Sequence, residues 1–268
     1  MTRLTAEEVT TLTDRLGEFE AGLREITGLG LRELAMRTVA HPPVCVPLYG
    51  ARVAAVPVTS GEGVIRGFSD CVVAILRHLG CDAWVTAQPD LRGVQEAYDG
   101  AAEVVFLADD FRFVALNTGE RRCVDNDPAT ADGYATALEA AAGSLLSRHV
   151  LLLGLGPVGR GAARRLVSRG AAVEVVEPDQ ARLRAALDVG LKLQPVTLAD
   201  GLERCDLIFD ATPSGGFIDA GDVTPFTVAA VPGLPSAFTP AAQAALGARH
   251  IHEPLAIGVA VMVARAVV

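Results

Sequence analysis

Three glycines follow an apolar run in the middle of the chain, at Leu151–Leu153, in the pattern Gly-x-Gly-x-x-Gly. Such a turn can bind a dinucleotide, because its first glycine allows a tight turn and its second lets the backbone approach a pyrophosphate. The third lets the following helix pack closely on a sheet, and that helix points its backbone N–H groups at the phosphates. The residues predicted to contact a dinucleotide here are Gly154, Gly156, Pro157, Val158 and Gly159.

An acidic residue follows the next predicted strand. The apolar run Ala172–Val176 is followed by Glu177, roughly 20 residues beyond the glycines, where a carboxylate can accept a hydrogen bond from a ribose 2′-hydroxyl. The same carboxylate would repel the 2′-phosphate of NADP by a few kcal/mol. Arg182 and Arg184 come shortly afterwards, and we expect them on the solvated face of a helix rather than at a phosphate. The sequence therefore predicts NAD as the cofactor.

Two later strand ends are expected at the same site. Ligands of doubly wound sheets bind beyond the carboxyl ends of the strands. Thr212 and Pro213 follow an apolar strand, and Pro232 follows the next one. We therefore expect Thr212 and Pro213 to line the cofactor and Pro232 to lie near the nicotinamide. Ordinary turn chemistry would also account for these residue types, so the prediction rests on their place in the fold.

The N-terminal half carries polar residues at strand ends of its own. Asp109 and Asp110 end a buried strand, and because adjacent side chains point to opposite faces, only one is expected to face a cleft. A carboxylate there suits a substrate ammonium group, although a turn or a helix cap would also use aspartate. The residues Thr59–Gly63 follow an earlier strand, and their amides and hydroxyl groups can hold a carboxylate or form a plain turn.

The elements that position these residues alternate between strand and helix, which predicts an α/β fold with a parallel sheet. We expect residues 129–268 to form a Rossmann domain with a doubly wound parallel sheet. Residues 1–128 are expected to form an α/β substrate-binding part with an N-terminal helical cap. That cap begins with a capping box at Thr5–Glu8. Its first helix, over about residues 6–25, is expected either to close over the substrate as a lid or to pack at a domain or dimer surface.

Composition excludes several classes of function. The formal net charge of −9 and the lack of a basic, aromatic-interleaved patch argue against nucleic-acid binding. The N-terminus has no secretory pattern, and the apolar stretch Leu255–Val268 is too short to span a bilayer, so we expect a cytoplasmic protein. The scattered cysteines and histidines have no metal-ligand spacing. The stretch Leu255–Val268 is expected to pack on the core or to pair with a second copy in a homodimer.

Beyond these separate motifs, nearly the whole chain resembles the PylD family, the dehydrogenases of pyrrolysine biosynthesis. The Thr-Ser-Gly turn, the Ala-Asp-Asp strand end and the Glu-Pro-Leu-x-Ile-Gly tail, in this order and spacing, are more specific than the glycines. Phe111 departs from the family, which has a small polar residue after the aspartate pair. The resemblance rests on Val56–Gly61, Ala108–Asp110, Asn126, Gly154–Gly159, Ala211–Pro213, Pro232-Gly233 and Glu253–Gly258.

The resemblance implies a reaction. The substrate would be 3-methyl-D-ornithyl-N6-L-lysine, whose terminal amine is oxidised by hydride transfer to NAD. The resulting imine or aldehyde then closes on the other amine to give the pyrroline ring of pyrrolysine. Ammonia is lost, and the water that an aldehyde route takes up is released again on ring closure. Asp109 would anchor the substrate amine, and Ser60 and Asn126 would bind polar groups of the substrate. No histidine or lysine is predicted as a general base.

Two other functions remain open at this stage. One is an NAD-dependent amino-acid dehydrogenase or cyclodeaminase that acts on another diamino acid. The other is a protein that senses NAD without turning it over, although the lack of a DNA-reading element weighs against the usual form of that function.

Overall fold

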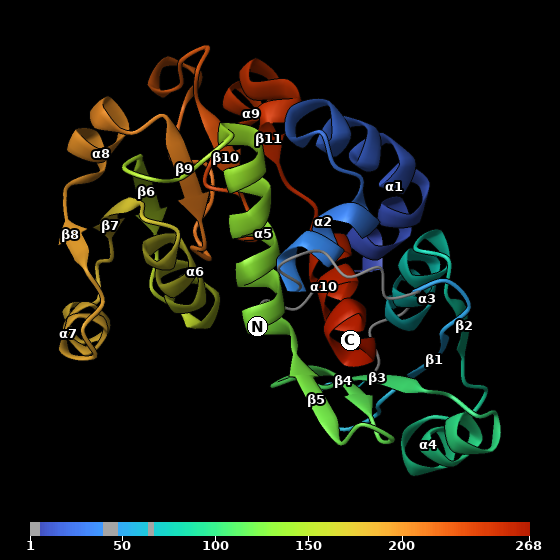
Figure 1. Cartoon of the computed structure of the whole chain (residues 1–268). Coiled ribbons are helices and arrows are strands. Elements are labelled where there is room, and N and C mark those ends of the chain that lie inside the picture. The colour runs from blue at the N-terminus through green and yellow to red at the C-terminus, as the bar shows by residue number, and fades with distance from the viewer. Residues whose placement is uncertain (1–5, 40–47, 64–66) are drawn as a thin grey trace. The chain divides into compact units, whose positions relative to one another are not determined.

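The computed structural model describes residues 6–39, 48–63 and 67–268, with side chains described from residue 15 onward. The chain forms two compact units (Figure 1). Unit 1 comprises residues 1–20, 31–129 and 255–268, and unit 2 comprises residues 21–30 and 130–254. The expected capping box at Thr5–Glu8 falls outside the described side chains. Within the described ranges, none of the helices combines the length and apolarity needed to cross a membrane.

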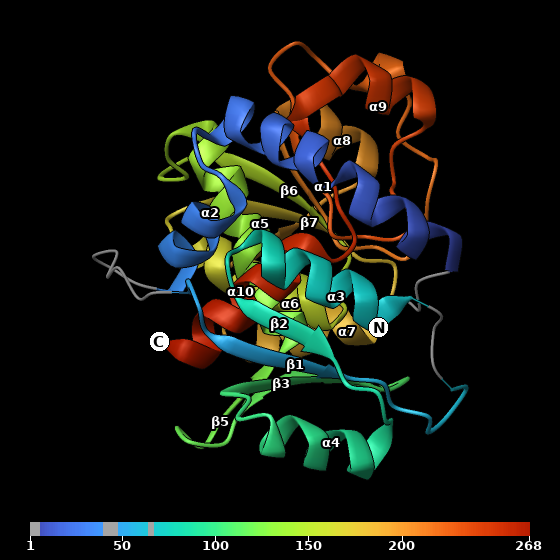
Figure 2. The ribbon, with the colours of Figure 1, turned by 90° about the vertical axis from the view of Figure 1, so that its right-hand side faces the viewer.

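Unit 1 is built on a five-stranded sheet in the order β2-β1-β3-β4-β5. The first three strands pair in parallel, and β4 and β5 complete the sheet as an antiparallel hairpin. Helix α4 lies on one face of this sheet and α3 and α10 lie on the other (Figure 2). The strands are β1 (Arg52–Val56), β2 (Asp82–Val85), β3 (Val104–Ala108), β4 (Phe113–Asn117) and β5 (Arg122–Asp125). The helices are α1 (Ala6–Thr27, divided between the units), α2 (Leu31–Val39), α3 (Phe68–His78), α4 (Asp90–Asp99) and α10 (Ala256–Val267).

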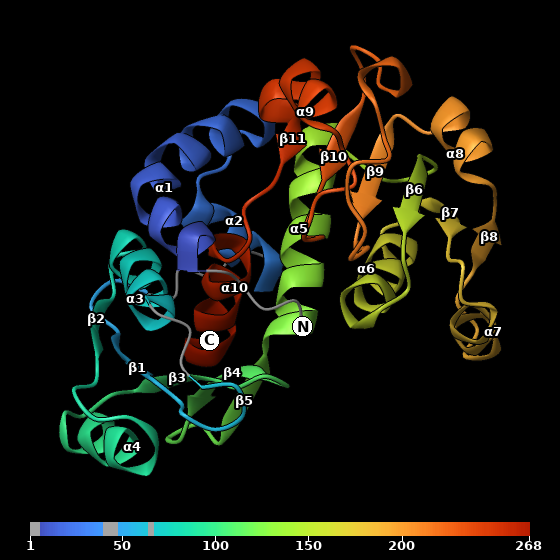
Figure 3. The same ribbon diagram turned by 180° about the vertical axis from the view of Figure 1, so that it is seen from behind.

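Unit 2 carries a six-stranded, all-parallel sheet in the order β11-β10-β9-β6-β7-β8 (Figure 3). Numbered within the unit, this is the 3-2-1-4-5-6 order of a Rossmann fold, which confirms the predicted fold class. The strands are β6 (His149–Leu153), β7 (Ala172–Val176), β8 (Leu193–Pro195), β9 (Leu207–Asp210), β10 (Val228–Ala230) and β11 (His250–Ile251). The helices are α5 (Asn126–Ala142, which begins in unit 1), α6 (Pro157–Ser168), α7 (Gln180–Asp188), α8 (Leu198–Arg204) and α9 (Pro240–Leu246), with short 3₁₀ turns at Ala220–Asp222 and Gly247–Arg249.

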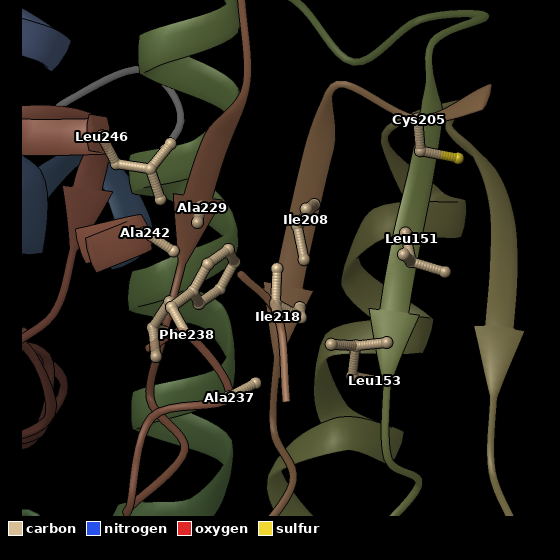
Figure 4. Close-up of a cluster of buried hydrophobic side chains, with 11 residues drawn as sticks. Leu151, Leu153, Cys205, Ile208, Ile218, Ala229, Ala237, Phe238, Ala242 and Leu246 are labelled. Atoms are coloured by element: carbon tan, nitrogen blue, oxygen red, sulfur yellow. The ribbon is translucent and has the colours of Figure 1, made fainter. Parts of the chain in front are cut away.

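One face of the unit 2 sheet is held by a buried apolar cluster (Figure 4). Leu151 and Leu153 of β6 and Ile208 of β9 alternate along their strands, so their side chains share this face. Phe238, which is 1% exposed, fills the space between these strands and α9. The cluster fixes the strands whose carboxyl ends carry the predicted cofactor residues.

The sequence prediction grouped Leu255–Val268 with the Rossmann segment 129–268, whereas in the structure this stretch belongs to unit 1. Helix α10 packs against α2, α3 and the strands β3–β5, and ten of its residues are buried. Asn117 and Arg122 of the β4–β5 hairpin donate hydrogen bonds to the carbonyls of Ala266 and Arg265, at 2.9 and 2.8 Å. These bonds satisfy carbonyl groups that the end of a helix leaves without an intrahelical partner. Because α10 lies in the core, it offers no apolar face to a second copy, and the homodimer stays a prediction.

Candidate active site

The glycine turn of unit 2 joins β6 to α6. Gly154 has a φ of +85°, which is the left-handed backbone that glycine tolerates. A Cβ atom on Gly159 would lie 2.1 Å from the Gly154 carbonyl oxygen, so α6 can sit this close to the turn only with glycine there. The sequence assigned both roles to these residues.

The start of α6 is open in the way that a phosphate requires. Gly156 is the N-cap residue and, being glycine, provides no side-chain cap. Pro157 opens the helix, and Val158 and Gly159 follow it in the first turn. Among the residues that the structure describes, no atom outside the turn lies within 4 Å of the position that a Cβ atom on Gly156 would take. The N-cap residue therefore supplies no side-chain acceptor to the first N–H groups of α6, and the space above Gly156 is clear for an anion.

Glu177, at the end of β7, is only 8% exposed and binds the glycine turn directly. Its Oε2 accepts from the Leu155 N–H at 2.6 Å, and its Oε1 accepts from the Asp179 N–H at 2.9 Å. Each carboxylate oxygen retains a second lone pair, so the same group fits a ribose hydroxyl. Arg182 pairs with Asp179, and both Arg182 and Arg184 are exposed, as expected for a solvated helix face.

The loops after β9 and β10 are tied together by Asp210, which is fully buried. Its carboxylate accepts from the Thr212 N–H at 3.0 Å and from the Ala237 N–H at 2.8 Å, and its carbonyl accepts from the Gly233 N–H at 2.9 Å. Burial raises the pKa of Asp210 to about 6, although these two side-chain hydrogen bonds oppose the shift. Thr212, Pro213 and Pro232 thus stand on one linked pair of loops.

Unit 2 therefore gathers all of its predicted cofactor residues at the carboxyl edge of one parallel sheet. A Cβ atom on Gly154 would lie 3.0 Å from the Ala211 carbonyl oxygen and 3.3 Å from the Thr212 Cα, so the glycine turn and the Thr212 loop are direct neighbours. The next strands along, β7 and β10, contribute Glu177 and Pro232. This edge is where open α/β sheets bind their ligands.

The predicted substrate residues of unit 1 also share one sheet edge. Strands β1, β2, β3 and β5 run in the same direction, so the segments that follow them meet at the same edge. Ser60 follows β1, Asp109 follows β3, and Asn126 follows β5 and begins α5. Ser60 and Asp109 are exposed there, and Asn126 is half-buried.

The two neighbouring aspartates have different partners. Asp109 Oδ1 accepts from the backbone N–H groups of Phe111 and Arg112, at 2.8 and 2.7 Å, and these bonds hold its pKa below the ordinary value. Asp110 instead turns to the residues after β1, where its Oδ2 accepts from the Glu62 N–H at 2.7 Å. A Cβ atom on Gly61 would lie 1.9 Å from that oxygen, so Asp110 and Gly61 fit only as a pair.

A second acidic pair stands at the end of β5. Asp125 forms an ion pair with Arg112 at 3.1 Å and accepts from the Asp127 N–H at 3.0 Å. Burial, followed by the charge of Asp125, raises the pKa of Asp127. The edge that carries Asp109 and Asn126 therefore holds more aspartates than the single Arg112 can pair, and this acidic excess suits a cationic ligand. Within the described part of the chain, no group of three or more side chains could hold a metal ion.

Three residues of this architecture were not identified from the sequence as site residues. In the sequence Asp110 is only the neighbour of Asp109, and no motif singles out Asp210. Asp90 begins α4 and binds Thr59, and its signal in the sequence is no more than an aspartate after a proline. Each of these carboxylates has a partner between 27 and 48 positions away along the chain, which no local pattern reveals.

Comparison with known proteins shows the family of the chain. Residues 8–124 match the family model described as "Pyrrolysine biosynthesis protein PylD, N-terminal domain". The pyrrolysine synthase of Methanosarcina acetivorans is 33% identical over 266 residues, which cover 98% of each chain. The pyrrolysine synthase of Methanosarcina barkeri is 32% identical and covers 98% of this chain and 97% of its own. The chain belongs to the PylD family. The resemblance seen in the sequence is thereby confirmed.

Solved structures support the fold of this PylD family member. A quinate dehydrogenase from Corynebacterium glutamicum, solved in complex with NAD, matches with a TM-score of 0.54 at 15% identity, over 81% of this chain and 94% of that one. An aspartate transcarbamoylase from Trypanosoma cruzi matches with the same TM-score at 14% identity, over 99% and 93%. At such low identity these likenesses speak for the fold alone.

Proposed function

We propose that this protein oxidises the terminal amine of 3-methyl-D-ornithyl-N6-L-lysine with NAD and releases pyrrolysine after ring closure. The observation that carries the proposal is the match to two pyrrolysine synthases over almost the full length of both chains. A chain that aligns from end to end retains both the cofactor unit and the unit with the acidic edge. The proposal needs both units.

We assign the cofactor to the carboxyl edge of the unit 2 sheet. The uncapped start of α6 and the clear space above Gly156 fit a pyrophosphate. Glu177 fits a ribose hydroxyl and disfavours a 2′-phosphate, which supports NAD over NADP. Thr212, Pro213 and Pro232 would line the rest of the cofactor. When bound, NAD would supply the chemistry by accepting a hydride from the carbon that bears the amine.

We assign the substrate to the acidic edge of unit 1. The lowered pKa of Asp109 keeps its carboxylate ionised, so that it can anchor an ammonium group of the substrate. Ser60 and Asn126 would bind further polar groups of the substrate. The amine that reacts must be neutral before its carbon can lose a hydride, and because Asp109 is exposed, water can take that proton.

The test is a turnover assay with purified protein, NAD and synthetic 3-methyl-D-ornithyl-N6-L-lysine. We expect NADH absorbance to rise and pyrrolysine to appear by mass spectrometry, with NADP giving at least tenfold lower kcat/KM. Lysine and ornithine serve as comparison substrates. NADH formation from ornithine or lysine but not from the dipeptide-like substrate would favour another amino-acid dehydrogenase. Release of ammonia from either amino acid without net NADH would favour a cyclodeaminase. NAD binding without turnover of any amine would favour an NAD sensor.

A further inference from the structure

Asp90 holds an unusual backbone conformation at the carboxyl edge of unit 1. Its φ is +53°, in the left-handed region that residues other than glycine rarely adopt. Such strain persists only where the surrounding structure enforces it, and it gathers at functional sites. Asp90 follows β2, and its neighbour in the sheet is β1, which leads into the predicted substrate residues.

The side chain of Asp90 binds the segment after β1 instead of its own helix. Asp90 is the first residue of α4, and the N-cap residue before it, Pro89, has no side-chain acceptor for the first turn. Both carboxylate oxygens go to Thr59, with Oδ1 accepting from its N–H at 2.7 Å and Oδ2 accepting from its hydroxyl. The Asp90 N–H adds a third bond, to the Pro57 carbonyl at 2.9 Å.

The segment that carries Asp90 is itself held in place. A Cβ atom on Gly93 would lie 2.3 Å from the Gln88 carbonyl oxygen and 2.6 Å from Val56 Cγ1, so the first turn of α4 sits tightly on the end of β1. Glu96 accepts from the N–H groups of Ala87 and Gln88, at 2.9 and 3.1 Å. The backbone around Asp90 is therefore held in place, and the Asp90 side chain in turn holds Thr59.

The segment after β1, residues Thr59–Gly63, is thus held by hydrogen bonds from two sides. Asp90 holds Thr59, and Asp110 holds the Glu62 N–H three residues later. Ser60 lies between these two hydrogen-bonded positions, and its side chain is exposed. The two aspartates come from the segments after β2 and β3, the neighbours of β1 on either side of the sheet.

We propose that Asp90 is a positioning residue for substrate binding, which sets the place of Ser60 by holding Thr59. This inference rests on the proposed function, because it takes Ser60 as a substrate ligand. Asp90 itself does not contact substrate in this assignment. It acts through Thr59, and we take its left-handed backbone as the conformation that places its carboxylate against Thr59.

The decisive variant is Asp90→Gly. Glycine accepts the left-handed backbone without strain, and the variant removes the carboxylate that binds Thr59. We expect the melting temperature to be retained, the KM for 3-methyl-D-ornithyl-N6-L-lysine to rise at least about tenfold, and the Kd for NAD to stay within about twofold. Hydrogen exchange should become faster at the Thr59 and Ser60 amides. Asp90→Asn keeps an acceptor for the Thr59 N–H and should show a smaller rise in KM.

The matched control is Ala101→Gly. Ala101 also has a left-handed backbone, with a φ of +54°, but it follows the other end of α4. The Ala101→Gly variant should leave the substrate KM, the Kd for NAD and the hydrogen exchange at the Thr59 amide unchanged. Wild-type turnover is measured first, and its absence would overturn the proposed function and this inference together. If the wild type turns over and Asp90→Gly keeps its KM, or loses NAD binding and substrate binding equally, the inference alone is wrong.

Discussion

Two adjacent carboxylates at the end of β3 have different hydrogen-bond partners because their side chains point to opposite faces. Asp110 is committed to the Glu62 N–H and to the space beside Gly61. Asp109 binds only its own turn, through Oδ1. The sequence predicted that only one of the pair would face a cleft. It could not predict which, because the choice depends on where the strand ends and on a partner 48 positions away.

Asp109→Asn tests the proposed ammonium anchor. Asparagine keeps the Oδ1 acceptor for the Phe111 and Arg112 amides but removes the charge that would bind an ammonium group. Because a hydrogen bond between ionised partners is stronger than one to a neutral amide, we expect the substrate KM to rise at least about tenfold with an unchanged Kd for NAD. Steady-state kinetics and a binding titration measure the two quantities. An unchanged KM would remove Asp109 from the site.

Asp210 predicts a pH dependence of stability. Its pKa is raised by burial to about 6, so the folded state holds the proton more tightly than the unfolded state does. The resulting contribution is fully present below the unfolded pKa of about 3.9 and is lost as the pH rises through about 6. The free energy of unfolding of the wild type, relative to Asp210→Asn, should therefore fall by up to about 3 kcal/mol between pH 4 and pH 7. Urea unfolding of both proteins across this range measures the difference, and a pH-independent difference would contradict it.

At the scale of elements, the glycine turn and α6 were predictable because their signals are local. The strand, the turn and the helix are consecutive, and each glycine has a conformational reason within a few residues. Strand β5 was not predicted, since Arg122–Asp125 has no apolar alternation and only Val124 is buried. It forms because β4 offers a sheet edge and because Arg122 can reach the end of α10.

The glycine turn allows a prediction that separates binding from folding. A Cβ atom on Gly156 meets no described atom outside the turn within 4 Å, so Gly156→Ala should keep the melting temperature while it blocks the approach of a pyrophosphate. We expect the Kd for NAD to rise at least about tenfold. Gly159→Ala is the contrasting variant, because its Cβ would lie 2.1 Å from a backbone oxygen and should lower the melting temperature as well. Calorimetric titration and thermal unfolding distinguish the two, and tight NAD binding by Gly156→Ala would argue against the assigned pyrophosphate site.

At the scale of the whole molecule, the order of segments along the chain hides the division into units. The residues of unit 2 from 130 to 254 are contiguous, so its Rossmann order could be anticipated from the succession of strands and helices. Unit 1 is completed only by α10, which follows the whole of the unit 2 segment 130–254 in the sequence. The sequence shows that Leu255–Val268 is apolar enough to be buried, but apolarity alone does not say in which core.

Removal of Leu255–Val268 should therefore unfold unit 1 and spare unit 2. The buried Ile257, Val259, Val261, Met262 and Val263 contribute on the order of 10 kcal/mol, which is comparable with the whole stability of a domain. We expect the amides of β1, β3 and β4 to lose protection from hydrogen exchange while those of β6 and β9 keep it. Removal of Val268 alone, which is 42% exposed and lies beyond the helix, should change neither set. Equal loss of protection in both units would show that α10 supports a single cooperative fold, and that the two cores do not fold independently.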